Sequence, residues 1–174
     1  MKIGDNMDKQ NKTLISRFGF NDPDLTTPLH DKIILSITED KLKEIISNID
    51  ILKGKNYKIH GIAHEVPIKA SNDYIIGFID AVATIAYDNR QTCDPMCDPV
   101  KFIKIYIEVK TTIPSYGELV RQLNMYRDGL SIDDVYTLVI SPDDRFASAL
   151  KDQGILFYKY EIIHQPSKPE NLDW

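Results

Sequence analysis

The stretch Phe102-Ile-Lys-Ile-Tyr-Ile-Glu-Val-Lys110 decides the fold of this chain. Its aliphatic residues fall at every second position, from Ile103 to Val109. The positions between and after them hold Lys104, Tyr106, Glu108 and Lys110. Because successive side chains of a β-strand point to opposite faces of the sheet, this alternation predicts a strand with one apolar face. Glu108 and Lys110 then stand side by side on the other face.

The segments on either side of this strand are predicted to be helical or extended in turn. A helical pattern over residues 29–53, as one helix or two, precedes extended patterns over 57–68 and 74–87. After the strand come a helix with a capping box at Ser115 and Glu118, a strand at 135–140, a helix at 141–151 and a strand at 155–160. The first three strands can form an antiparallel meander, and the next follows a helical crossover and pairs in parallel. The prediction is an α/β fold, a mixed β-sheet flanked by helices.

Length and composition fit a single folded domain. The 174 residues are 43% hydrophobic and 27% charged, which suits a chain that buries a core. We predict an irregular N-terminal segment over residues 1–28, one domain over 29–165 and a tail over 166–174. No apolar stretch approaches the roughly 20 residues that cross a bilayer, and the polar N-terminus lacks the apolar core of a secretory signal. We therefore expect a cytoplasmic protein with no membrane partner.

The formal net charge of −5 argues against a protein that coats DNA, because the phosphate backbone rewards net positive charge. It does not exclude an enzyme with a metal site, since acidic metal ligands themselves add negative charge. The chain has two cysteines, Cys93 and Cys97, in a polar segment that contains prolines. Two thiols do not complete a four-ligand zinc or iron–sulfur site. We interpret them as unpaired thiols, with a metal or redox role as the alternative.

Three further positions are candidate site residues. Asp80 lies in an apolar, strand-like run, where a lone carboxylate is costly unless it is paired or bound to a metal. Gln122 and Tyr126 lie four apart on the helix after Lys110, and therefore on one side of it. Each has an ordinary structural interpretation: a locally paired aspartate, polar residues at the border of an amphipathic helix and, for Glu108 and Lys110, an ion pair on an exposed sheet face.

In combination these motifs resemble the PD-(D/E)XK nuclease superfamily. The Gln122-x-x-x-Tyr126 ending resembles its RecB-like branch, and the motifs span residues 65–126. The resemblance implies a restriction-endonuclease-like core and a metal-dependent nuclease that hydrolyses DNA phosphodiester bonds with Mg²⁺ or Mn²⁺. One position departs from the motif, because Ile79 stands before Asp80 where the motif's name has proline.

The resemblance also implies a role for each residue of the site. Oxygen ligands for the metal ion would come from Asp80, Glu108 and the main-chain carbonyl of Val109, and hard oxygen ligands suit Mg²⁺ or Mn²⁺. Lys110 would orient or activate the attacking water and stabilise developing charge. Gln122 would position the water or the phosphate, and Tyr126 would support Lys110 or the backbone phosphate.

A further acidic or histidine member of the site is left open. Glu65 precedes the Asp80 strand and could be an additional acidic residue. The family often draws an acid or a histidine from its first helix instead, and Glu44 and His30 are the candidates here. The RecB-like branch prefers histidine, which nominates His30.

We expect DNA, single- or double-stranded, as the substrate, and homo-oligomer formation is an open possibility. The alternative is a catalytically silent module that retains this fold and acts through protein or nucleic-acid binding. The presence of Asp80, Glu108, Lys110 and Gln122 in one chain favours the enzyme, because a decayed copy would be expected to lose at least one of them.

Overall fold

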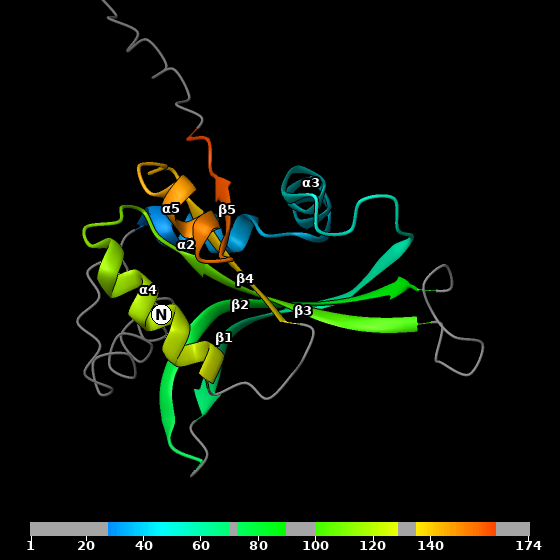
Figure 1. Ribbon diagram of the computed structural model, residues 1–174, viewed down its shortest axis with the longest axis horizontal. Coiled ribbons are helices and arrows are strands. Elements are labelled where there is room, and N and C mark those ends of the chain that lie inside the picture. Colours follow the sequence, from blue (N-terminus) through cyan, green and yellow to red (C-terminus); the bar gives the residue numbers. More distant parts are fainter. Residues whose placement is uncertain (1–27, 70–72, 90–99, 129–134, 163–174) are drawn as a thin grey trace, which may run out of the picture.

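The computed structural model describes residues 28–69, 73–89, 100–128 and 135–162 (Figure 1). In chain order their helices and strands are α2 (Pro28–Ser36), α3 (Glu39–Ile49), β1 (Tyr57–Lys69), β2 (Ile75–Asp88), β3 (Val100–Val109), α4 (Tyr116–Asp128), β4 (Val135–Ser141), α5 (Ala147–Asp152) and β5 (Leu156–Lys159). The predicted order of helices and strands is confirmed. The first helical region forms two helices, since Thr38 caps α3 by accepting a hydrogen bond from the Lys41 amide at 3.3 Å.

Some predicted features lie outside the described residues. They include Cys93, Cys97, the tail over 166–174 and the predicted N-terminal segment, except that Pro28 is the first residue of α2. Within the part of the chain that the structure describes, no helix is both long enough and apolar enough to cross a membrane.

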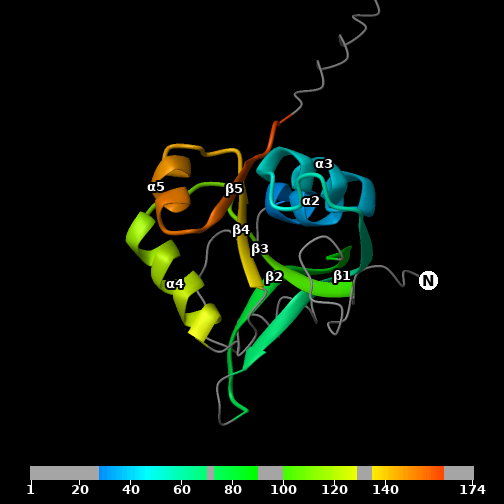
Figure 2. The ribbon, with the colours of Figure 1, turned by 45° about the vertical axis from the view of Figure 1, so that its right-hand side comes forward.

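One mixed β-sheet separates two hydrophobic cores (Figure 2). Its strand order is β1-β2-β3-β4-β5, with antiparallel pairing of β1 with β2 and of β2 with β3, and parallel pairing of β3 with β4 and of β4 with β5. Helices α2 and α3 cover one face and bury side chains such as Ile33 and Leu42. Helices α4 and α5 cover the other face and bury Leu119, Leu123 and Leu150. The predicted α/β class and mixed sheet are therefore confirmed.

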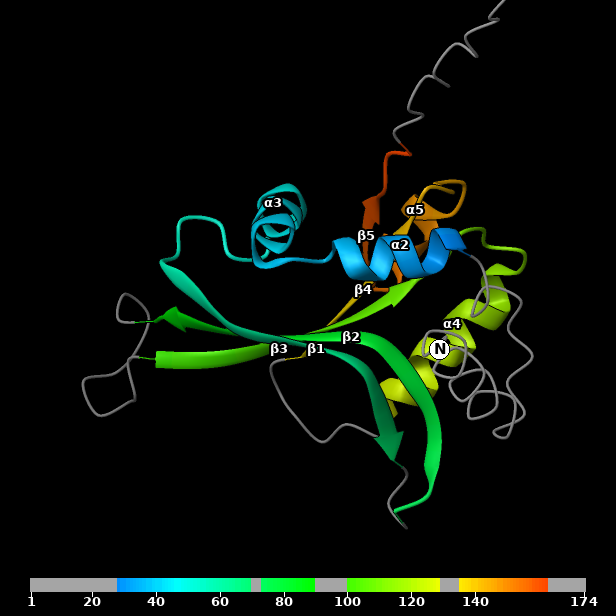
Figure 3. The ribbon, with the colours of Figure 1, turned by 180° about the vertical axis from the view of Figure 1, so that it is seen from behind.

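Strand β2 leaves the plane of the sheet half-way along its length. Its pairing with β3 runs from Asp88↔Val100 to Ala81↔Ile107 and ends there, whereas its pairing with β1 continues to Lys69↔Ile75. The end of the β1–β2 hairpin therefore curves away from β3 (Figure 3). Glu65 of β1, opposite the point where β2 and β3 part, has a left-handed backbone with φ of 51°. Few non-glycine residues adopt this conformation.

The last helix is shorter than predicted. The sequence Ser141-Pro-Asp predicts a helix start, but α5 begins only at Ala147. The reason is that the Asp143 carboxylate accepts a hydrogen bond at 2.9 Å from the Ile113 amide, in the loop between β3 and α4. Arg145 donates to the same carboxylate at 2.7 Å and to the Ile113 carbonyl at 3.2 Å. These bonds join two loops, and the residues that make them do not enter a helical first turn.

This junction between the loops predicts a dependence of stability on pH. The Arg145 guanidinium, helped by the backbone amides of Ile113 and Arg145, holds the pKa of Asp143 well below its usual range. A lowered folded-state pKa stabilises the protein above the unfolded value of about 4, and this contribution is lost as the pH falls. Asp143→Asn is therefore expected to be less stable than the wild type near neutral pH, with a difference that narrows by about pH 3. Urea unfolding of both proteins, near neutral pH and at about pH 3, measures this difference in stability.

Asp144→Asn is the matched control for this experiment. Asp144 pairs with Lys159 at 2.7 Å, but both side chains are exposed and water screens the pair. Its removal should change stability little at either pH. A difference between Asp143→Asn and wild type that is the same at both values would contradict the prediction.

Candidate functional site

The candidate site lies where β2 and β3 separate. The register would continue with Asp80 opposite Glu108 and then Ile79 opposite Val109, but the pairing of β2 with β3 ends at Ala81↔Ile107. Instead, the Val109 amide donates a hydrogen bond of 2.7 Å to Oδ2 of Asp80. The side-chain carboxylate thus takes the place of a main-chain carbonyl, and it is buried, with 7% of Asp80 exposed. Because β2 bends away here, the Asp80 carboxylate points toward the main chain of β3.

Glu108 and Lys110 are both buried, with 3% and 8% exposed. Nζ of Lys110 lies 3.2 Å from Oε1 of Glu108, and Nε2 of Gln122 on α4 donates to the same oxygen at 2.9 Å. The alternative of an ion pair on an exposed sheet face is therefore wrong. Helix α4 covers this face, and it also buries Tyr106, two positions before Glu108.

Tyr126 connects α4 to β2. Its hydroxyl accepts a hydrogen bond of 2.9 Å from Nε2 of Gln122 and donates one of 3.1 Å to the Phe78 carbonyl. Burial, together with the nearby charge of Glu108, raises the pKa of Tyr126 to about 12, so the hydroxyl keeps the proton it donates. These contacts hold Gln122 in position, whereas the sequence suggests that Tyr126 supports Lys110 or a phosphate.

Strand β2 passes α4 at a distance that leaves no room for a side chain. A Cβ atom on Gly77 would lie 2.7 Å from Cε1 and 2.9 Å from Oη of Tyr126. Such contacts are well below van der Waals separation, and only glycine fits them. Gly77 is a residue of the site that sequence reasoning missed, and its signal is a lone glycine inside a strand pattern.

His30 is the first-helix residue that the structure brings to the site. It is 3% exposed, and its Nε2 lies 3.5 Å from Oδ1 of Asp80. Burial lowers the pKa of His30, but the carboxylates of Asp80 and Asp31 raise it by more, so the net shift is upward. The position of His30 three and four residues before Ile33 and Ile34, which are also buried, places it on the inner face of α2.

Glu44 and Glu65 are placed differently. Glu44 is on α3, where its carboxylate pairs with Lys41 at 2.8 Å and accepts a hydrogen bond from the Tyr158 hydroxyl of β5. Glu65 stands across from Asp80 on the edge strand β1, but its side chain is exposed. Within the described ranges, no three side chains of Asp, Glu, His and Cys gather closely enough to hold a metal ion by themselves.

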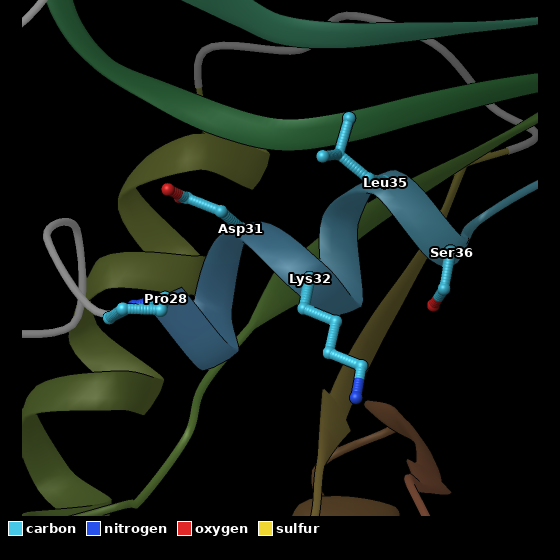
Figure 4. A pocket seen from close by; sticks show the side chains of 5 residues that line it. All are labelled: Pro28, Asp31, Lys32, Leu35 and Ser36. Atoms are coloured by element: carbon cyan, nitrogen blue, oxygen red, sulfur yellow. The ribbon is translucent and has the colours of Figure 1, made fainter. Parts of the chain in front are cut away.

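The outer side of α2 carries a hollow of about 580 Å³. Its lining residues are Pro28, Asp31, Lys32, Leu35 and Ser36 (Figure 4). None of the candidate site residues is among them. The candidate site is thus defined by buried charged side chains where two strands separate, and not by this hollow.

Comparison with family models, with curated proteins and with solved structures gives no match to this chain.

Proposed function

We propose that this protein is a metal-dependent nuclease that hydrolyses phosphodiester bonds of DNA, built on a restriction-endonuclease-like core. The observation that carries the proposal is the burial of Asp80, Glu108 and Lys110 together at the point where β2 and β3 separate. Burying three ionisable side chains costs free energy that well-packed apolar residues would not. Charge concentrated in this way is typical of functional sites.

The oxygen atoms of the site fit a magnesium or manganese ion. Mg²⁺ is usually held by one or two protein carboxylates and completes its shell with water and substrate phosphate. Asp80 and Glu108 supply two carboxylates from neighbouring strands, and the Val109 carbonyl is the third proposed ligand. A bound ion would lower the pKa of a coordinated water and neutralise phosphate charge.

The remaining residues have roles that follow from their contacts. Lys110, 3.2 Å from Glu108, places a cation where negative charge develops on the phosphate. Gln122 holds Oε1 of Glu108, and its amide is itself fixed by Tyr126. His30 braces Asp80 from α2. In this assignment Tyr126 and His30 are positioning residues.

The test is cleavage of labelled linear single-stranded, linear double-stranded and circular DNA with Mg²⁺ or Mn²⁺. We expect cutting by the wild type and none by Asp80→Asn, which keeps an acceptor for the Val109 amide but loses the charge that binds metal. Glu65→Gln in the same assay reports whether the exposed Glu65 contributes. A folded wild type that cuts no substrate and binds no Mn²⁺ by calorimetry would reject the enzyme in favour of the catalytically silent module.

A further inference from the structure

The paired ends of β1 and β2 curve away from β3 (Figure 3). This curved part carries exposed apolar side chains. Tyr74 is 72% exposed, Ile75 is 40% exposed and Phe78 is 38% exposed. Two of the three are aromatic. Phe78 precedes Asp80 by two residues, so an exposed ring lies close to the metal-ligand candidate on the same strand.

The contacts of β2 show which side of the strand the Phe78 ring occupies. Gly77 faces Tyr126 of α4, and Ile79 is buried in the core that α4 covers. Because side chains alternate along a strand, the Phe78 ring between these two residues points away from α4. Asp80, at the bend of β2, turns its carboxylate to the Val109 amide of β3 and to His30 of α2. At about 3.3 Å per residue, Phe78 stands about 7 Å from Asp80, and Tyr74 about 13 Å further along.

Exposed rings at this spacing suit one kind of substrate. The faces of bases are covered by their neighbours in a duplex, whereas the unpaired bases of a single strand can stack on aromatic side chains. Lys69 pairs with Ile75 across the hairpin, and its side chain is 56% exposed. Its Nζ lies 3.7 Å from Oδ1 of the exposed Asp73 in a pair that water screens, so it also supplies a cation to the phosphate chain. A docking site for an unrelated protein would have no reason to continue the strand that carries Asp80.

From this placement we infer that Tyr74 and Phe78 bind unpaired bases, so that the substrate enters the site as a single strand. The inference rests on the proposed nuclease function, because it assigns the substrate form for that same site. In this arrangement the bases stack on the end of the hairpin, and the phosphate chain runs past Asp80.

The test is binding of a fluorescent oligothymidylate of about 16 nucleotides, measured by anisotropy in EDTA so that nothing is cut. Loss of both rings, in Tyr74→Ala with Phe78→Ala, is expected to weaken binding at least about tenfold. Phe78→Tyr keeps a ring and should keep affinity, whereas Phe78→Leu keeps apolar volume alone and should not. The same sequence as a duplex should bind more weakly and should not respond to these substitutions.

Phe102→Ala is the matched control, because Phe102 is 54% exposed at the far end of the sheet. It should leave binding unchanged, and thermal unfolding confirms that each variant is folded. Equal effects of Phe102→Ala and Phe78→Ala, or binding that ignores the loss of both rings, would overturn the inference even if the protein cuts DNA. Ring-dependent binding without any metal-dependent cutting would support the stacking surface and reject the nuclease.

Discussion

Replacing Lys110 with methionine is expected to abolish metal-dependent cleavage, with a fall in kcat of at least about a hundredfold. In metal-free buffer the same substitution should lower the free energy of unfolding by about 3–5 kcal/mol, because it leaves the buried charge of Glu108 without the Lys110 cation. A loss of activity alone would therefore not separate a catalytic role from a structural one.

The double variant Glu108→Gln with Lys110→Met makes that separation for the Glu108–Lys110 pair as a whole, because Glu108 is itself a proposed metal ligand. Glutamine at position 108 still offers an acceptor to Gln122, which donates to Oε1 of Glu108 at 2.9 Å, and no buried charge is left uncompensated. Most of the lost stability should return, since neutral replacements of a buried pair are often well tolerated. Cleavage should not return. Urea unfolding and single-turnover cleavage of the same preparations measure the two quantities.

Lys104→Met provides the control for this pair of variants. Lys104 lies on the same face of β3, six positions before Lys110, and is partly exposed near the open end of the strand. It should change neither stability nor kcat appreciably. Recovery of cleavage together with stability in the double variant would show that the buried Glu108–Lys110 pair has a structural role alone.

Much of the fold follows from local patterns in the sequence. The alternation before Lys110 predicts β3, and the capping box predicts α4, where the Glu118 amide donates to the Ser115 hydroxyl at 3.3 Å. The short final helix does not follow from local pattern. Asp143 reads as part of a helix start, but it bonds to Ile113, thirty positions earlier in the chain. Here a tertiary hydrogen bond overrides the local preference for a helix.

The site follows from the sequence in composition but not in environment. Glu108 and Lys110 can be placed on one face of a strand, but an exposed and a buried face have the same alternation until α4 is known to cover them. The choice between His30 and Glu44 also depends on tertiary structure, because it is decided by which helix lies against Asp80. The left-handed backbone at Glu65 carries no sequence signal, because glutamate is not a residue that favours it.

Gly77→Ala is expected to destabilise the protein by about 1–3 kcal/mol and to reduce cleavage, although it adds a single methyl group. The added Cβ would lie 2.7 Å from Cε1 of Tyr126. The ring cannot swing aside at low cost, because Tyr126 is 3% exposed and its hydroxyl is bonded to Gln122 and to the Phe78 carbonyl. Any shift of the ring therefore moves Gln122, which holds Glu108.

Two further variants distinguish this chain of contacts from general damage to a strand. Gly61→Ala is the matched control, because a Cβ on Gly61 of β1 would meet nothing within 4 Å, and it should be tolerated. In Gly77→Ala with Tyr126→Leu the smaller side chain makes room for the methyl group, so the combined loss of stability should be smaller than the sum of the single losses. Cleavage should stay low in that double variant, since Gln122 has lost the hydroxyl that fixes it.

Additive losses of stability would mean that a side chain at position 77 and the ring of Tyr126 do not clash. Full activity in Gly77→Ala would mean that the position of Gln122 does not depend on how closely β2 packs against α4.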